Sequence, residues 1–375
     1  MPGVGAAQLE TETAGSLPSG QRTATEGSRR PWVASAAAFW AVVVVFGVVT
    51  VLWSAHVGVG LRDPGGRMFR NKLAGSVLLF LALAVLDVLV RTVRSGWSVA
   101  QLKAQFATRW DVRRLALLLA GIVGYHVVYI SYRNMKSWDA FNTPRDDDLL
   151  AFDRHLFGGH SPATLLHDLL GQSSAMAGFL AHVYESFPQL VSLTIVAAPA
   201  FITATRRGLV TPAAGMWAWI LGTISYYAIP SLGPCYSAAA DFAGLPHTMI
   251  TDNQAHYMDQ RLAFLAHPSD PSTFVSISAF ASLHVGLTCM ITLLAAYYRK
   301  RVLTVVLAVY LVLVAVSTLY FGWHFFSDVI AGVVLAALSV ALGHLTVYPR
   351  SPLAHRRRPI AAAAPTSAPA ACVTE

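Results

Sequence analysis

The sequence predicts an all-α integral membrane protein. Only 12% of its 375 residues are Asp, Glu, Lys or Arg, and 55% are apolar, whereas charged residues make up about 25% of a soluble globular chain. The mean hydropathy is +0.53. Such a chain lacks the polar surface of a water-soluble protein. Its apolar residues also gather in segments of about 20, the length of a helix that crosses a bilayer.

Eight segments are predicted to be transmembrane helices. They lie near 34–56, 73–93, 114–133, 176–204, 211–231, 276–298, 302–322 and 325–348. Prolines punctuate the fourth and fifth segments, which membrane helices tolerate when neighbouring groups satisfy the freed carbonyl. We expect two extra helices with their connections over 34–113, followed by a six-helix catalytic core over 114–348.

The tails and two long connections differ in composition from these spans. Residues 1–33 and 349–375 are rich in Gly, Ser, Pro and Ala, so both are predicted to be disordered. The connection 134–175 contains LLAFDRHLFGG and SPATLLHDLLG, in which apolar residues recur at helical spacing. This spacing predicts helix lying in the membrane interface. The connection 232–275, with its glycines and prolines, is predicted to be a structured loop and not a ninth span.

The positions of the charges indicate a topology. With both termini inside, 18 of the 27 Lys and Arg residues fall in inner segments and nine in outer ones, which is the positive-inside bias of membrane proteins. The net charge of +8 therefore reflects topology, and we expect no nucleic-acid partner. We expect a protein of the plasma membrane whose two long connections face the extracytoplasmic side. The 56–72 connection, with Arg62, Arg67, Arg70 and Lys72, opposes the bias.

Asp87 and Arg91 are the clearest ionisable pair inside a span. They lie four residues apart in the second segment, toward the inner side, and this spacing places them on one helical face. We expect an ion pair that eases insertion of the helix.

Two histidines and one aspartate are the strongest candidates for chemistry. His324 and Asp328 lie four residues apart at the junction of the last two spans, and His284 lies at the outer end of the sixth. A carboxylate that accepts a proton from one imidazole nitrogen leaves the other nitrogen free as nucleophile or base. The second histidine could then protonate a leaving group. The topology places both histidines at the same depth on the same side.

Other interpretations of these residues stay open at this point. An interfacial histidine can be a snorkelling ring, and Asp328 with Ser327 can cap the last helix. His, His and Asp are also competent metal ligands, although the histidine clusters of membrane di-iron oxygenases are absent from the sequence. The three cysteines, Cys235, Cys289 and Cys372, are too scattered for a disulfide framework or a thiolate metal site.

The motifs around these residues resemble the type 2 phosphatidic acid phosphatase superfamily. Its phosphatases show Lys-x6-Arg-Pro, Pro-Ser-Gly-His and Ser-Arg-x5-His-x3-Asp. Here Leu283 replaces the glycine of the second motif, and Thr318 replaces the arginine of the third. Both departures are typical of the inositol phosphorylceramide synthase branch, to which TLYFGWHFFSDVIAG is similar over its whole length. The segment YYAIPSLGPCY at 226–236 is placed like the proline-rich segment of that branch. The resemblance covers about residues 125–345.

The resemblance implies a phosphohistidine mechanism without metal or other cofactor. His324 would attack phosphorus, Asp328 would orient it, and His284 would protonate the departing oxygen. The Lys-x6-Arg-Pro motif is missing, so its cations must come from elsewhere. The candidates for binding phosphate are Arg261, Arg133 and Lys136. Arg261 is the only Lys or Arg between 232 and 275. Arg133 and Lys136 could equally be interfacial cations that contact lipid headgroups.

We therefore predict a membrane enzyme that acts on a lipid phosphate or phospholipid. The motif departures favour an inositol-phosphotransferase-like enzyme over a simple lipid phosphate or pyrophosphate phosphatase. Glu185, near His182 in the fourth span, is a candidate for binding an acceptor hydroxyl or positioning a histidine, although a hydrogen-bonded core pair would look the same. A lipid transporter without covalent chemistry would also show ionisable residues and proline-broken helices in its spans.

Overall fold

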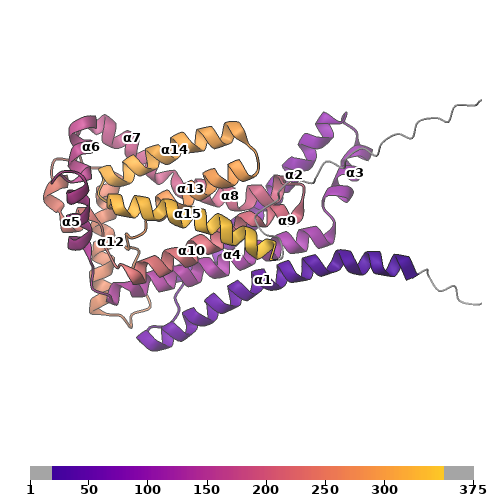
Figure 1. Ribbon diagram of the computed structural model, residues 1–375, viewed down its shortest axis with the longest axis horizontal. Coiled ribbons are helices and arrows are strands. Elements are labelled where there is room, and N and C mark those ends of the chain that lie inside the picture. Colours follow the sequence, from indigo (N-terminus) through magenta and orange to yellow (C-terminus); the bar gives the residue numbers. More distant parts are fainter. Residues whose placement is uncertain (1–18, 350–375) are drawn as a thin grey trace, which may run out of the picture.

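The structure is a computed structural model that describes residues 19–349, with side chains from residue 33 onward. These residues form helices, turns and loops without a strand, so the predicted all-α class is confirmed (Figure 1). The long helices are α1 (Ser19–Val57), α2 (Arg70–Arg94), α4 (Val112–Trp138), α8 (Phe187–Phe201), α10 (Val210–Ala228), α12 (Met249–Ala266), α13 (Leu283–Tyr297), α14 (Arg301–Tyr320) and α15 (Phe326–Val347). The shorter ones are α3 (Val99–Arg109), α5 (Asp146–Leu156), α6 (Pro162–Leu170), α7 (Ser174–Glu185), α9 (Thr205–Gly208) and α11 (Pro234–Ser237).

Five of the described helices are long and apolar enough to cross a membrane. These spans are Val33–Val57, Pro64–Arg94, Val112–Phe141, Arg301–Tyr320 and Phe326–Val347. The other three predicted spans coincide with the α7–α8 pair, with α10 and with the shorter α13. The protein is thus a multi-pass membrane protein, and the count of eight crossings stays a prediction. Helix α1 begins at Ser19, inside the segment assigned to the N-terminal tail, and residues 1–18 and 350–375 lie outside the described residues.

The predicted fourth span is broken into two helices. Helix α7 ends at Glu185 and α8 begins at Phe187, with Pro188 in its first turn. Proline lacks the N–H that would continue the hydrogen-bond ladder of α7, but it fits the first turn of a new helix. The break places the first turn of α8 beside the start of α13, where the ring of Phe187 lies 4.6 Å from that of His284.

The predicted sixth span starts later than expected, because residues 274–282 are not helical. Their backbone N–H groups donate to other segments instead of to a helix of their own. Val275 donates to Ser137 Oγ at 2.9 Å, and Ala279 donates to Ser231 O at 2.9 Å. Helix α13 begins only after Ser282, whose side chain caps it by accepting from Val285 N. The prediction of helix from residue 276 is therefore wrong by seven residues.

The connection 232–275, predicted to be a structured loop, contains a helix. Helix α12 has 18 residues and is too polar to be a candidate span. A capping box between Thr248 and Thr251 starts it, and such reciprocal side-chain bonds satisfy the free N–H groups of a first turn. The connection 134–175 was expected to form helix lying in the membrane interface. Helices α5 and α6 confirm that it is helical.

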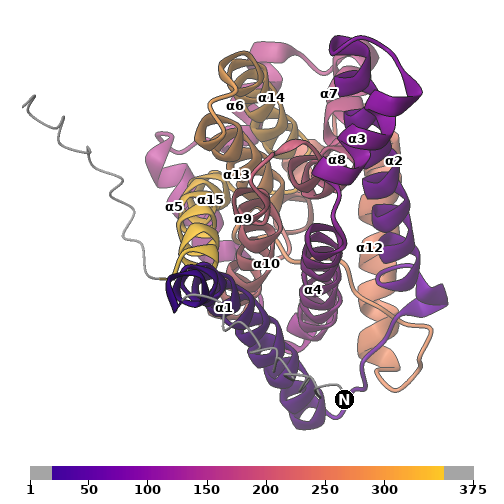
Figure 2. The same cartoon turned by 90° about the vertical axis from the view of Figure 1, so that its right-hand side faces the viewer.

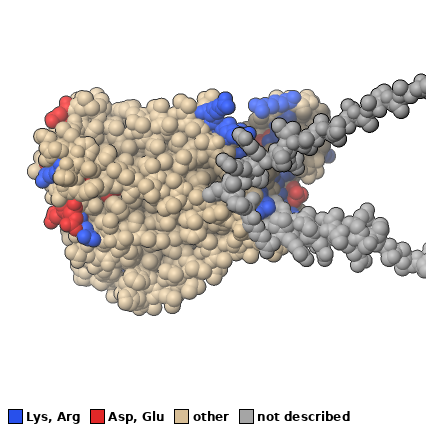
Figure 3. Space-filling view, viewed as in Figure 1, with Lys and Arg blue, Asp and Glu red and all other residues tan. Residues whose placement is uncertain are grey.

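The helices form a bundle whose two ends differ in structure and charge. Helices α5, α6 and α12 gather at one end, which we call the capped end, and α3 and α9 lie at the other (Figure 1). Between them the visible surface is almost free of charged side chains (Figure 3), as expected of a face that contacts lipid tails. In the end-on view of Figure 2, α10 and α13 lie toward the middle of the bundle, with α1 and α2 toward its edge.

Candidate active site

A buried histidine–aspartate pair lies at the turn between α14 and α15. The Nδ1 atom of His324 is 3.3 Å from Asp328 Oδ2, which also accepts a 3.0 Å hydrogen bond from Phe325 N. Asp328 is fully buried and His324 is 5% exposed. Among the described residues, Asp328 Oδ1 has no hydrogen-bond partner. Because the carboxylate binds Nδ1, the Nε2 atom of His324 is the one available for chemistry.

His284 brings a second imidazole to that free nitrogen. Its Nδ1 lies 3.3 Å from Nε2 of His324. The ring of Tyr184 stacks on His284 with centroids 4.4 Å apart. The first turn of α13 is fixed to α15, since Ser282 N donates to Asp328 O at 3.1 Å. The three predicted catalytic residues therefore lie in one hydrogen-bonded row, Asp328–His324–His284.

Helix α5 holds the turn that presents His324. Asp153 accepts hydrogen bonds from the backbone N–H groups of Phe326 and Ser327 and so caps the start of α15. Seven residues earlier, Asp146 accepts from Leu232 N at 3.0 Å and Gly233 N at 2.7 Å. Burial raises the pKa of both carboxyl groups, and these backbone N–H groups oppose the increase. Helix α5 thus holds two loops of the site in place.

The segment after α10 packs directly on the same turn. Cys235 N donates to Gly322 O at 2.9 Å. Gly233 has φ +114°, and a Cβ atom there would lie 2.7 Å from the carbonyl oxygen of Trp323. Only glycine fits such a close approach in this backbone conformation. The GPC sequence therefore supports the backbone next to His324.

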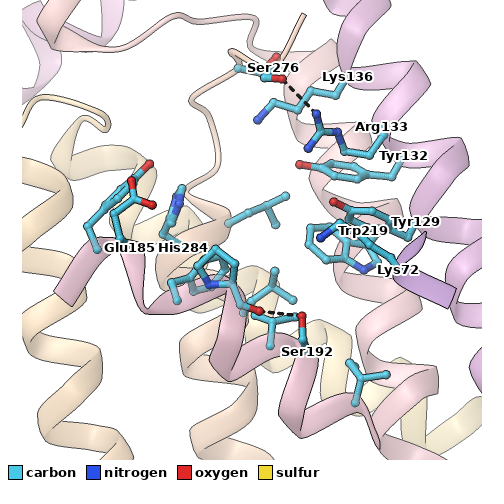
Figure 4. A pocket seen from close by; sticks show the side chains of 18 of the residues that line it. Lys72, Tyr129, Tyr132, Arg133, Lys136, Glu185, Ser192, Trp219, Ser276 and His284 are labelled. Carbon is cyan, nitrogen blue, oxygen red and sulfur yellow. Dashed lines mark hydrogen bonds between the residues drawn. The ribbon is translucent and has the colours of Figure 1, made fainter. Parts of the chain in front are cut away.

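A cavity of about 480 Å³ lies in front of the two histidines, and both line it. Arg133 and Lys136, from the last turns of α4, line the opposite wall with Tyr129 and Tyr132 (Figure 4). Arg133 Nη2 donates to Ser276 Oγ at 3.0 Å, and Lys136 Nζ lies 5.1 Å from the centre of the Tyr226 ring. Among the described residues, no carboxylate lies within ion-pairing distance of either cation. Two cations and two imidazoles therefore face one space.

The other two predicted site residues differ in placement. Glu185 lines the cavity and accepts a 3.0 Å hydrogen bond from Asn253 on α12. Arg261 is 8% exposed but is not among the cavity-lining residues. Burial lowers the pKa of Arg261, and the nearby carboxylates of Asp139 and Asp146 oppose this decrease. The structure brings Glu185 to the space in front of the histidines and leaves Arg261 outside it.

His324 is held as the neutral base. Burial, and to a smaller extent the charge of Lys136, lower its pKa from the ordinary 6.5 to about 3. A neutral imidazole whose Nδ1–H faces Asp328 has its lone pair on Nε2, toward the cavity. This arrangement can deliver nitrogen as a nucleophile to an electrophilic centre bound between the histidines and the cations.

The comparisons with known proteins agree with this geometry. The sequence profile of the PAP2 superfamily matches residues 147–342. The chain belongs to the PAP2 superfamily. No curated protein and no solved structure matches it. Membership suggests a function of the lipid phosphatase type, in a superfamily of phosphatases and phosphotransferases.

The PAP2 match divides the cavity wall into two parts. It begins in α5 and ends in α15, so it includes His284 and His324 but not α1 to α4. Arg133 and Lys136 on α4 lie outside it. Thr318, which stands where the superfamily's phosphatases have arginine, is fully buried and is not among the lining residues. The cavity of this PAP2 protein thus takes its cations from helices that precede the matched region.

Several residues around the PAP2 site were not predicted. Asp146 and Asp153 looked like ordinary acidic positions of an amphipathic helix, because their backbone partners Gly233 and Phe326 are 87 and 173 residues away. Lys72 lines the cavity. From the sequence it was noted only as a cation that opposes the positive-inside bias. A signal existed for Ser76 and His126, which are polar residues within spans and are joined at 3.1 Å, since such residues in spans usually have a role.

The described residues include no group of three or more His, Cys, Asp or Glu side chains arranged to hold a metal ion. The side chains of Asp328, His324 and His284 contact one another in a row, His324 Nδ1 with Asp328 Oδ2 and His324 Nε2 with His284 Nδ1. The chemistry that these residues offer is that of a nucleophile, an orienting carboxylate and a proton carrier.

Proposed function

We propose that the protein is a membrane phosphotransferase that acts on a lipid phosphate or phosphodiester through a phosphohistidine on His324. The observation that supports this most directly is the row Asp328–His324–His284 in front of a cavity whose opposite wall presents Arg133 and Lys136. A nucleophile, an orienting carboxylate and a proton carrier thus face cations that suit a phosphoryl group.

In the first step, Nε2 of His324 attacks phosphorus and the bond from phosphorus to the departing oxygen breaks. Asp328 accepts the hydrogen bond from His324 Nδ1–H and stabilises the positive charge that develops on the ring. His284 enters this step as the imidazolium, gives one proton to the departing oxygen and becomes neutral. The resting contact of 3.3 Å between the two imidazoles leaves His284 adjacent to the position that the phosphoryl group would occupy. Arg133 and Lys136 would neutralise the phosphoryl oxygens.

In the second step, an acceptor hydroxyl attacks the phosphohistidine. His284 takes the proton of that hydroxyl, and the bond between Nε2 and phosphorus breaks, which restores both histidines. With water as acceptor the same steps are hydrolysis. Leu283 and Thr318, in place of the glycine and arginine of the phosphatase motifs, favour transfer to a lipid or polyol hydroxyl, as in the inositol phosphorylceramide synthase branch. Glu185 lines the same cavity as His284, and in this proposal its carboxylate accepts a hydrogen bond from such a hydroxyl.

The charges favour a site on the extracytoplasmic side of the plasma membrane. Eleven described cations lie at the end opposite to the capped end, where the described acidic residues are only Asp87 and Asp111. The cations are Arg91, Arg94, Lys103, Arg109, Arg113, Arg114, Arg206, Arg207, Arg299, Lys300 and Arg301. A positive end is the inner end by the positive-inside rule, so the capped end and its cavity would face outward.

The phosphohistidine can be trapped directly. Purified protein given a lipid phosphate labelled with radioactive phosphorus should retain label that is lost in acid and stable in base. His324→Ala should abolish the label, whereas His182→Ala, which alters an exposed histidine on α7, should keep it. Label of unchanged amount on His324→Ala would refute the assignment of the nucleophile.

Transfer and hydrolysis separate in the same assay. With inositol or diacylglycerol present, a transferase yields labelled acceptor phosphate in excess of free phosphate, and a phosphatase yields free phosphate alone. A lipid transporter without covalent chemistry would give no label, and its uptake into vesicles would persist in a variant that lacks His284, His324 and Asp328.

A further inference from the structure

The cavity extends well beyond the histidines, to a helix outside the matched PAP2 region. Residues Lys72, Gly75, Ser76 and Leu79 of α2 line it. Their spacing of i, i+3, i+4 and i+7 means that one continuous face of α2 borders the space. Facing residues of α8 have the same spacing, and they are Pro188, Val191, Ser192 and Ile195. The two helices therefore form two sides of one compartment.

The cavity is open between these two helices. Its exposed lining residues, among those that the structure describes, are Lys72 and Gly75 on α2 and Pro188 and Ser192 on α8. The lining residues at the capped end, such as Asn253, Tyr257 and Ser276, are half-buried. Gly75 lies inside the candidate span Pro64–Arg94, so the opening faces the bilayer. We call this opening the α2–α8 portal.

The chemistry of the α2–α8 portal changes with depth. Lys72, near the start of α2, is exposed, and its ammonium lies 5.6 Å from the centre of the Tyr129 ring. Farther along the two helices, the lining side chains Leu79, Val191 and Ile195 are apolar. A cation above an apolar strip matches a molecule with an anionic headgroup and a hydrocarbon chain.

We propose that a phosphate-bearing membrane lipid reaches the site sideways through the α2–α8 portal. Its chain lies along Leu79, Val191 and Ile195, and its phosphate passes Lys72 to reach Arg133 and Lys136. The proposal rests on the proposed function, and it assigns the choice of lipid to a helix that precedes the matched region. It also gives Lys72 a role, and so explains why a cation lies on the outer side, where the positive-inside rule disfavours cations.

Gly75 offers a way to close the α2–α8 portal without disturbing the fold. A Cβ atom at Gly75 would meet nothing within 4 Å, and the same holds at Gly47 on α1. Gly75→Trp would fill the opening, and Gly47→Trp is the matched control. The substrates are a long-chain phosphatidic acid in mixed micelles and its dibutyryl analogue, which can also approach from water past Tyr257 and Ser276.

The measured quantity is the ratio of kcat/KM for the long-chain substrate to kcat/KM for the short-chain one. Gly75→Trp should lower this ratio at least tenfold, and Gly47→Trp should leave it within twofold of the wild-type ratio. Lys72→Met should raise KM for the long-chain substrate about three- to tenfold with little change in kcat. A ratio that Gly75→Trp leaves unchanged would overturn the proposal.

A binding experiment separates this proposal from the proposed function. A long-chain phosphatidic acid with a diazirine at its chain end should, after irradiation, label peptides from α2 and α8. The labelling should persist in His324→Ala and fall in Gly75→Trp. Labelling confined to α13 or α14 would overturn the α2–α8 portal even if His324→Ala abolishes the phosphohistidine. Labelling of α2 and α8 with activity retained in His324→Ala would overturn the proposed function and leave the portal standing.

Discussion

Two buried carboxylates, one at each end of the bundle, have opposite surroundings. The carboxylate of Asp87 on α2 forms ion pairs with Arg91 Nε and Arg109 Nε, each at 2.9 Å. Arg109 also donates a hydrogen bond to Ala200 O. Asp328 on α15 faces only an imidazole at 3.3 Å and one backbone N–H, and its Oδ1 has no partner among the described residues.

The difference indicates which buried charge serves stability and which serves chemistry. A carboxylate between two guanidinium groups is compensated in the ground state, and it ties α2 to α3 and α8. An under-compensated carboxylate beside a neutral imidazole gains most when that imidazole becomes positive, which occurs during nucleophilic attack. The site cations show the same contrast, since Arg133 and Lys136 face the cavity without a carboxylate within ion-pairing distance among the described residues. Their compensation would come from substrate.

The largest expected effect is that of Asp328→Asn on activity. An amide presents N–H to His324 Nδ1 and favours the tautomer with the proton on Nε2, which cannot attack phosphorus. Turnover of a lipid phosphate should fall about 10⁴-fold, as it does when the orienting carboxylate of other catalytic histidines is replaced. Thermal unfolding in detergent should change little. Asp148→Asn, an exposed site on α5, is the control, and equal activity of the two variants would contradict the comparison.

Asp87→Asn should have the converse effect. It leaves the Arg109 side chain, which is 6% exposed, without its charge partner, and breaking a buried pair in this way costs about 3–5 kcal/mol. The unfolding temperature in detergent should fall clearly, while kcat per folded molecule stays at the wild-type value. Loss of kcat with unchanged stability would show that the two ends of the bundle are coupled.

Spacing along the sequence was enough to predict the pair of residues on one helix within each of the two polar clusters, the one around Asp87 and the one around Asp328. The step of four residues predicted both Asp87 with Arg91 and His324 with Asp328, and the topology brought His284 to the same depth. Arg109 was not predicted as a partner of Asp87, because it comes from another helix and its position depends on how α2 and α3 pack. Helical periodicity gives the face of a residue on its own helix but not the neighbour that it meets.

The same limit explains the errors in the fold and in the choice of cations. Residues 276–282 contain no charged residue and no proline that would end a span, but hydrogen bonds to Ser137 and Ser231 hold the segment 274–282 out of a helix. The sequence does not reveal these long-range partners. Arg261 was favoured as the only cation in its connection, yet it lies near Asp139 and Asp146, away from the cavity. The direction of α12, which sets this position, is a property of the packed structure.

Lys136→Met tests whether the unpaired cations serve the reaction. Loss of one charge-stabilising group from a water-poor site costs about 10²–10³ in kcat. Lys136 also lowers the pKa of His324, so its removal should raise that pKa. Because His324 attacks only as the free base, the acid limb of the pH–rate profile should move to higher pH. Arg261→Met, a buried cation outside the cavity, is the control. A lower rate with an unmoved acid limb would mean that Lys136 binds substrate without acting on His324.

Gly332→Ala should have the smallest effect, and it probes the geometry between the two histidines. A Cβ atom at Gly332 would lie 2.6 Å from the carbonyl oxygen of Ser282, the cap of α13. Because that atom belongs to the backbone, α13 and α15 must separate, and the 3.3 Å contact of His284 with His324 must lengthen. A misplacement of about 1 Å costs up to about 10²-fold in rate, so kcat should fall about 10- to 100-fold. Gly178→Ala on α7, where a Cβ atom meets nothing within 4 Å, is the control. A normal kcat in Gly332→Ala would show that the protein does not need the observed spacing of the two imidazoles, and that His284 reaches the departing oxygen from another position.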